Sequence, residues 1–136
     1  QVRHVGVSNE TPYGISRFTE HAEWDDLPKI ACNQVPYNLL TRLRVEMSLV
    51  ETCGPKQCNV SMVATSTLGG GALTGKYLDE PSIYDRDLSL RFNAFPGFQA
   101  RFNMKRSREV MRKFIKIADR YDMTITELAL AWVYNK

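Results

Sequence analysis

STLGGGALTGKY, residues 66–77, is the most glycine-rich stretch of the chain, and it ends in Gly-Lys. Its spacing, Gly70-x-x-x-x-Gly75-Lys76, is that of a P-loop, which binds nucleotide phosphates through backbone N–H groups. A P-loop also needs a Ser or Thr after the lysine and a helix that begins there, but Tyr77 follows here and the next residues lack a helical period. We therefore expect a phosphate-binding loop of another fold, with a glycine loop that binds nothing as the alternative.

Strands alternate with helices on both sides of this loop. The hydrophobic patterns predict strands near 3–8, 29–35 and 59–65 and helices near 12–24, 44–53, 103–121 and 125–135. Such alternation is typical of parallel βα units, and the glycine loop directly follows the third strand, where α/β folds bind phosphates. Three strands do not by themselves distinguish a barrel from an open doubly wound sheet.

Local signals predict where the helices begin and which faces they bury. Thr11-Pro12 and the capping box Thr124-x-x-Glu127 mark two helix starts. The first strand is expected to be buried, and the irregular residues between the loop and the third helix are expected to form a lid. The residues expected to face the core are Ile15, Phe18, Ala22, Val45, Leu49, Cys53, Val110, Phe114, Ile117, Ala118, Tyr121, Ile125, Leu128, Ala129 and Trp132.

Composition limits the class of protein. The chain has 136 residues, 43% of them hydrophobic, and a net charge of +3, which suits one domain and gives no reason to expect a polyanionic partner. No apolar run is long enough for a membrane span. Three cysteines at irregular spacing indicate reduced thiols and a cytoplasmic protein, so the two glycosylation sequons at Asn9 and Asn59 are interpreted as chance matches. Because the chain begins in a strand-like run without Met, we expect a fragment of a longer protein.

Two other motifs in the sequence do not predict a functional site. Cys53-x₄-Cys58 with the two histidines is a poor zinc motif, because Gly54-Pro55 forms a turn and the histidines lack ligand spacing. The segment 101–116 carries seven Lys or Arg against one Glu, but its apolar stripe indicates the solvated face of a helix rather than a nucleic-acid site. We therefore expect neither a metal nor a nucleic-acid partner.

Three stretches together resemble one family. HVGVSNETPYGISRF (4–18), NQVPYNLL (33–40) and TSTLGGGALTGKY (65–77) resemble the aldo-keto reductases, in particular the bacterial-type branch that also resembles potassium-channel β-subunits. The resemblance covers nearly the whole chain. It implies an α/β fold, a partial (β/α)₈ TIM barrel, in which residues 1–136 supply about βα units five to seven and the following helix of one barrel domain.

The resemblance also implies an NADP(H) site. Ser8 and Asn9 would hydrogen-bond the nicotinamide carboxamide, which needs both a donor and an acceptor, and Gln34 would contact the same end. The residues implied at the pyrophosphate are Ser66, Leu68, Gly70 and Lys76, and Arg86 would lie over the cofactor. Thr65 departs from the family, which commonly places a Tyr or Trp there to stack on the nicotinamide ring. The preference for NADPH over NADH is likewise implied by the family.

The implied function is hydride transfer from NADPH to an aldehyde or ketone. The family's Asp, Tyr, Lys and His lie on earlier βα units, so no catalytic residue is assigned, and His4 and His21 are interpreted as structural. A non-catalytic cofactor-binding subunit like the channel β-subunits, or a degenerate reductase, is the alternative, which Thr65 favours slightly. We expect the isolated chain to bind NADPH poorly and to reduce nothing, and if it is the natural product its open sheet edges would favour aggregation or self-pairing. Neither the identity of the carbonyl substrate nor an oligomeric state follows from these residues.

Overall fold

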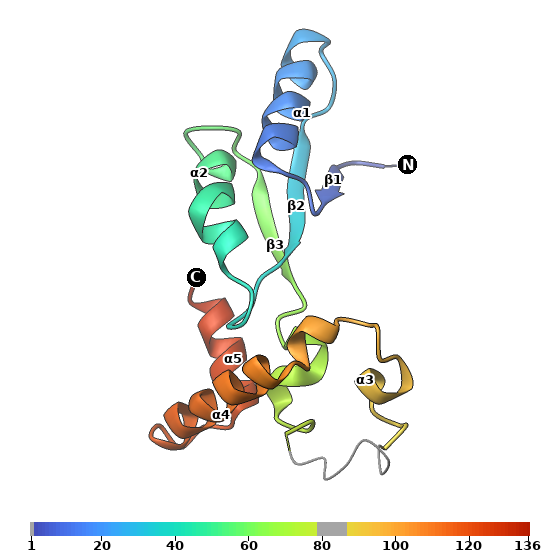
Figure 1. Ribbon diagram of the computed structural model, residues 1–136. Coiled ribbons are helices and arrows are strands. Elements are labelled where there is room, and N and C mark those ends of the chain that lie inside the picture. Colours follow the sequence, from blue (N-terminus) through green and yellow to red (C-terminus); the bar gives the residue numbers. More distant parts are fainter. Residues whose placement is uncertain (1, 79–86) are drawn as a thin grey trace. The chain divides into compact units, whose positions relative to one another are not determined.

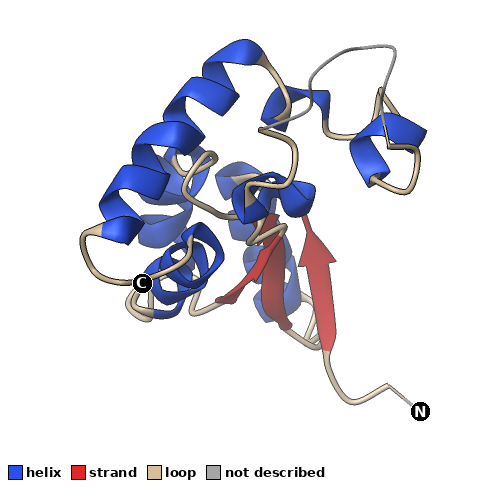
Figure 2. Ribbon diagram, turned by 90° about the horizontal axis from the view of Figure 1, so that it is seen from below, coloured by secondary structure: helices blue, strands red, loops and turns tan. Residues whose placement is uncertain are grey.

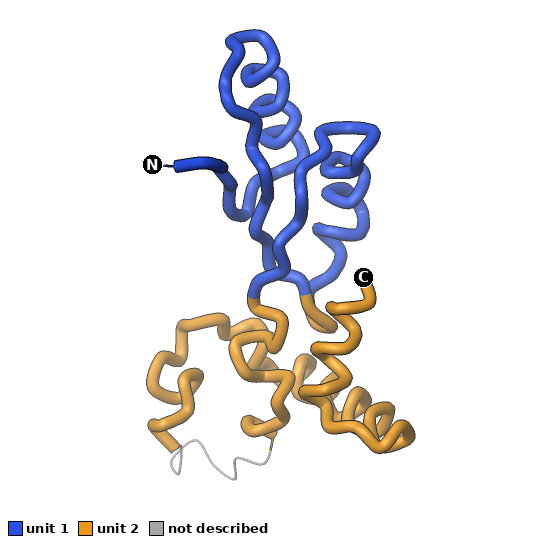
Figure 3. Tube along the Cα trace, turned by 180° about the vertical axis from the view of Figure 1, so that it is seen from behind, with its two compact units in different colours: residues 1–37, 41–65 blue, residues 38–40, 66–136 orange. Residues whose placement is uncertain are grey.

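A computed structural model describes residues 2–78 and 87–136 of the chain. The chain divides into two compact units, shown in different colours in Figure 3. Unit 1 comprises residues 1–37 and 41–65, and unit 2 comprises residues 38–40 and 66–136. Among the described residues, no helix combines the length and the apolar character needed to cross a membrane.

Unit 1 contains a parallel sheet of three strands (Figures 1 and 2). The strands are β1 (Val5–Ser8), β2 (Ile30–Pro36) and β3 (Ser61–Thr65), in the order β1-β2-β3. Ser8 pairs with Gln34, which in turn pairs with Val63. Because all three strands run in the same direction, their carboxyl ends lie along one edge of the sheet.

Helices connect the strands of unit 1. Helix α1 (Pro12–Trp24) begins as expected, because the Thr11 hydroxyl accepts a hydrogen bond from the Gly14 N–H at 3.1 Å and proline occupies its first turn. The single helix expected over 44–53 is instead a π-helical turn, η1 (Val45–Leu49), followed by the short helix α2 (Val50–Cys53). The expected inward residues Val45, Leu49 and Cys53 are all buried, whereas Met47 and Val50 of the same elements are exposed.

The two faces of this sheet differ near the carboxyl ends. Asn33 and Val35 are almost completely buried on the face along which α1 and α2 lie (Figure 1). Gln34 alternates with them along β2, and its partner on β1 is Ser8. Both residues are exposed on the opposite face. The expected burial of the first strand is therefore not found in this chain, in which β1 is exposed along most of its length. Phe18 on α1 is likewise 47% exposed rather than part of the core.

Unit 2 consists of helices and turns. Its elements are η2 (Gly69–Thr74), α3 (Arg91–Ala94), η3 (Ala100–Phe102), α4 (Lys105–Asp119) and α5 (Ile125–Tyr134). The expected capping box starts α5: the Thr124 hydroxyl accepts from the Glu127 N–H at 3.1 Å, and the Glu127 carboxylate accepts from the Thr124 N–H at 2.7 Å. The core comprises Ala72, Leu73, Tyr77, Leu78, Phe92, Phe102, Met111, Ile125 and Ala129.

The part of the expected lid that the structure describes, from residue 87 on, contributes to this core, whereas residues 79–86 lie outside the described residues. Phe92 on α3 stacks on Tyr77 with ring centroids 4.4 Å apart, and Phe102 on η3 is buried. On α4 the buried residues are Met111 and Ala118, whereas Ile117 and Tyr121 are 39% and 72% exposed. The expected core residue Ala118 is thus confirmed and Phe114 packs against the core, but Ile117 points outward and Tyr121 lies beyond the end of the helix.

Candidate functional site

A small hydrogen-bonded cluster lies at the carboxyl ends of β1 and β2. The Asn9 N–H donates to the Gln34 carbonyl at 2.8 Å, which extends the ladder by one residue. The Asn9 side-chain Nδ2 donates to the Ser8 hydroxyl at 3.2 Å, and Ser8 makes a long bond of 3.4 Å to the same carbonyl. Asn9 has a positive φ of 58°, a conformation that asparagine adopts more readily than most residues. Ser8, Asn9 and Gln34 are thus together and exposed on the open face.

Two further residues, which the sequence analysis did not identify, hold the turn that follows this cluster. Asn33 is fully buried, and its side-chain amide bonds both the N–H and the carbonyl of Glu10 at 3.2 Å. The Arg44 guanidinium donates to the carbonyls of Asn9 and Glu10. The turn after β1 is therefore held at several points. The sequence does contain one sign of this support, because Asn33 is a polar residue within a stretch that is otherwise expected to be an apolar strand.

Thr65 ends β3 and pairs with Pro36 across the ladder. Its carbonyl accepts from the Tyr37 N–H at 3.1 Å. The Tyr37 ring is buried, and its hydroxyl donates to the Glu46 carboxylate at 2.8 Å. Burial and this hydrogen bond raise the pKa of Tyr37 to about 12. Tyr37 is therefore a structural residue and does not offer an exposed ring in place of the missing aromatic.

The glycine loop bends sharply after β3. Ser66 has a positive φ of 54°, and Gly69, Gly70 and Gly71 have φ values of 58°, 67° and 100°. The Gly69 N–H donates to the Ser66 carbonyl at 2.7 Å, and the Gly71 N–H donates to the Leu68 carbonyl at 3.0 Å. Glycine tolerates these left-handed conformations without steric cost, so three consecutive glycines permit a turn that other residues would strain.

Asn38 and Gln99, both distant in sequence, support the loop. Asn38 is fully buried, and its Nδ2 donates to the Ser66 carbonyl at 2.8 Å. Gln99 Nε2 makes a long 3.5 Å bond to the Ser66 hydroxyl, whereas Gln99 Oε1 is buried and has no hydrogen-bond partner within the described parts of the chain. A Cβ on Gly70 would lie 2.6 Å from that oxygen and 3.1 Å from the Phe92 ring. The loop therefore requires glycine at residue 70.

The Lys76 side chain lies close to the glycines of the loop. An ideal Cβ on Gly71 would lie 3.3 Å from Lys76 Cε, and the Lys76 ammonium is 5.4 Å from the centre of the Tyr77 ring. Lys76 also borders a basic hollow of about 760 Å³ that includes Arg112 and Lys116. Residues 75–78 form turns rather than the start of a helix, so the structure does not support a P-loop.

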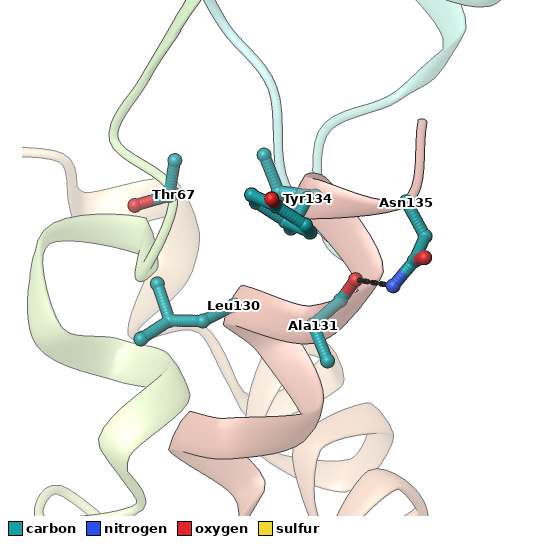
Figure 4. Close-up of a pocket in the computed structure, with 6 residues that line it drawn as sticks. Thr67, Leu130, Ala131, Tyr134 and Asn135 are labelled. Atoms are coloured by element: carbon teal, nitrogen blue, oxygen red, sulfur yellow. Dashed lines mark hydrogen bonds between the residues drawn. The ribbon is translucent and has the colours of Figure 1, made fainter.

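An apolar recess lies beside the start of the same loop (Figure 4). Its volume is about 500 Å³, and it is lined by Thr67, Leu130, Ala131, Val133, Tyr134 and Asn135. The Asn135 side chain donates to the Ala131 carbonyl at 2.7 Å, which caps the end of α5. The lining of the recess is therefore mainly apolar, and its polar side chains are those of Thr67, Tyr134 and Asn135.

The predicted residues consequently fall into two groups. Ser8, Asn9, Gln34 and Thr65 lie at the strand ends of unit 1, and Ser66, Leu68, Gly70 and Lys76 belong to the glycine loop of unit 2. Arg86 lies outside the described residues. No cluster of three or more His, Cys, Asp or Glu that could hold a metal is found in residues 2–78 and 87–136.

Comparison with known proteins agrees with the resemblance. The family model described as the aldo/keto reductase family matches residues 1–136. The chain is 36% identical over 137 residues to an aldo-keto reductase of Babesia bovis, covering 100% of this chain and 47% of that protein. It is 36% identical over 135 residues to the protein Tas of Escherichia coli K12, covering 98% of this chain and 36% of that protein.

A plant relative is more distant. A probable aldo-keto reductase 1 of Glycine max is 29% identical over 136 residues, which is 100% of this chain and 35% of that protein. The chain thus spans less than half the length of these relatives. Because the family model matches the chain from end to end, the chain belongs to the aldo/keto reductase family.

Proposed function

We propose that the whole protein is an NADP-dependent reductase that transfers a hydride to an aldehyde or ketone. In this proposal residues 1–136 supply about βα units five to seven of a (β/α)₈ barrel and the helix that follows. The observation that carries it is the exposed cluster of Ser8, Asn9 and Gln34 at the carboxyl ends of parallel strands. In barrels of this type, active sites are built at that end of the strands.

The cluster fits a nicotinamide carboxamide in its chemistry. A carboxamide presents an N–H₂ donor and a carbonyl acceptor, and its partner must offer both complements. Because Asn9 Nδ2 is engaged with the Ser8 hydroxyl, the Asn9 side-chain Oδ1 would be the atom that accepts from the ligand. The Gln34 side chain is exposed and supplies a second amide. These side chains would fix the orientation of the ring.

The glycine loop fits a diphosphate. Consecutive glycines with positive φ leave no Cβ over the backbone, so a phosphate can approach closely. Lys76 adds a mobile positive charge beside Gly71. Ser66 and Leu68 complete the proposed set, with Arg86 as a further candidate.

NADPH, when bound, supplies the hydride. By the resemblance, the residues that donate the proton to the carbonyl oxygen belong to earlier βα units. In this proposal residues 1–136 bind and orient the cofactor. None of them is proposed to transfer a proton.

The test uses the whole protein that contains this chain. We expect Gln34→Ala to weaken NADPH binding about tenfold, the equivalent of one good hydrogen bond, as measured by calorimetric titration. The matched control is Ser61→Ala, which alters an exposed residue on the same face at the opposite end of the strands. If both variants bind NADPH like the parent protein, the proposed site is wrong. Oxidation of NADPH with a panel of aldehydes and ketones tests the reaction.

A non-catalytic or degenerate cofactor-binding protein is the second candidate. Thr65 favours it, because a threonine cannot stack on a nicotinamide ring as the family's usual aromatic residue does. Under this candidate the protein binds NADPH but oxidises none with any carbonyl compound. Thr65→Trp should then raise the affinity for NADPH without creating turnover.

A further inference from the structure

Cys53 and Cys58 lie at the two ends of a tight turn. Cys53 is the last residue of α2, and Cys58 precedes β3 by a short lead-in (Figure 1). The Cys58 N–H donates to the Thr52 carbonyl at 3.1 Å, and the Val60 N–H donates to the Cys53 carbonyl at 3.0 Å. The backbone therefore doubles back on itself, and these bonds bring the backbone of Cys58 close to that of Cys53.

These hydrogen bonds limit the separation of the two cysteines. The Thr52 carbonyl belongs to the peptide unit that ends at the Cys53 Cα, so a hydrogen bond from the Cys58 N–H places the two Cα atoms within about 7 Å. Disulfides join Cα atoms roughly 4.4 to 6.8 Å apart, so the turn needs little or no movement to close one.

The two thiols differ in their surroundings. Burial raises the pKa of the Cys53 thiol, and the neighbouring Cys58 raises it further. Cys58 is half-buried, and its sulfur is 4.0 Å from the Ser16 hydroxyl of α1, whereas Cys53 is 6% exposed.

We propose that Cys53 and Cys58 form a redox-active pair that a peroxide closes to a disulfide. The more accessible Cys58 thiolate attacks the peroxide O–O bond, gains one oxygen as a sulfenic acid and releases hydroxide or alkoxide. The Cys53 sulfur then attacks the Cys58 sulfur, forming the S–S bond and displacing the oxygen as water. Two thiols are oxidised, and one peroxide is reduced.

Closing this bond would tie the end of α2 to the lead-in of β3. The turn lies at the amino end of β3, whereas Thr65 lies at its carboxyl end. We therefore expect the disulfide to stabilise unit 1 without changing cofactor binding. This separation makes the inference independent of the proposed function.

The experiment maps the oxidised bond in the whole protein. The protein is treated with substoichiometric hydrogen peroxide, its remaining thiols are alkylated under denaturing conditions, and it is digested with trypsin. Trypsin cleaves after Lys56, between the two cysteines, so a disulfide appears as two linked peptides 2 Da lighter than their sum. We expect this species to form and to disappear after reduction with dithiothreitol.

Variants decide the outcome. Cys32→Ser removes the third thiol, which lies on β2, and should leave the linked peptides unchanged. Cys53→Ser should abolish them and let dimedone trap the sulfenic acid on Cys58. If the wild-type protein keeps both thiols alkylatable, or if Cys58 oxidises fully without linking to Cys53, the proposal is wrong. NADPH binding measured before and after oxidation should agree within error, and a loss on oxidation would contradict the expected independence.

Discussion

The strand-end cluster of unit 1 and the glycine loop of unit 2, the two parts of the proposed site, are built in opposite ways. In the cluster, regular strands present side chains, and the supporting residue Asn33 is adjacent in sequence to the exposed Gln34. In the loop, the backbone is irregular, and its supports, Phe92 and Gln99, lie far along the chain. The cluster depends on the alternation of covered and exposed residues along a strand. The loop depends on contacts between residues that are far apart in the sequence.

This difference implies different sensitivities. A substitution at an exposed strand position should alter binding and leave stability nearly unchanged. A substitution at the glycine loop, or beneath it, should alter both, because the loop conformation and the core of unit 2 share the same residues. The variants below test that distinction, and each is measured in the whole protein by thermal or denaturant unfolding.

Phe92→Ala should have the largest effect. Its buried ring stacks on Tyr77 and lies directly under Gly70, so truncation leaves a cavity that should cost about 3–5 kcal/mol of unfolding free energy. Phe95→Ala, at a ring that is 65% exposed, is the control and should change stability by about 0.5 kcal/mol or less. Equal losses in the two variants would show that the α3 segment does not support the loop.

Gly70→Ala should cost about 1–3 kcal/mol, because a side chain at φ 67° is strained and its Cβ would meet Gln99 and Phe92. It should also weaken NADPH binding if the loop holds the diphosphate. Gly97→Ala is the matched control, since a Cβ there meets nothing within 4 Å. A stable Gly70→Ala protein would argue that the loop tolerates other conformations.

Asn33→Ala should cost about 2 kcal/mol, because it removes a fully buried amide and leaves the part-buried Glu10 N–H without its side-chain acceptor. Its sequence neighbour provides the comparison: Gln34→Ala, on the open face, should leave the unfolding midpoint nearly unchanged. If the two variants lose the same stability, the assignment of covered and open faces fails.

The smallest effect concerns pH. Hydrogen bonds from the Thr124 N–H and hydroxyl lower the pKa of the Glu127 carboxyl, so its ionised form stabilises the folded state. This contribution is present above the ordinary glutamate pKa of about 4.3 and is lost as pH falls below it toward the lowered folded value. Glu127→Gln should therefore lower the melting temperature at pH 7 and converge with the parent below about pH 4. Glu109→Gln, on the exposed side of α4, is the matched control.

Several elements of both regions follow from local sequence. Thr11 and the Thr124–Glu127 pair locate helix starts because caps act on N–H groups within the same turn. The three motifs located the strand ends and the glycine loop, and the family match agrees with them.

Other features depend on contacts that local patterns do not contain. The exposure of β1 depends on which neighbours cover its face, and no alternation pattern encodes that. The burial of Phe92 and Phe102 could not be expected from a segment without helical period, because their partners Tyr77 and Met111 are distant in sequence. The π-helical turn over Val45–Leu49 likewise has no local signal that distinguishes it from an α-helix.

The alternation along β2 separates two kinds of mutational tolerance. Replacement of Asn33 or Val35 disturbs the covered face, so selection for folding should restrict those positions. Replacement of Gln34 changes an exposed group at little cost in stability, so that position is free to follow selection on ligand binding. If the proposed site is right, adjacent codons would thus evolve under different constraints, and a change at residue 34 would alter what the protein binds while its fold is kept.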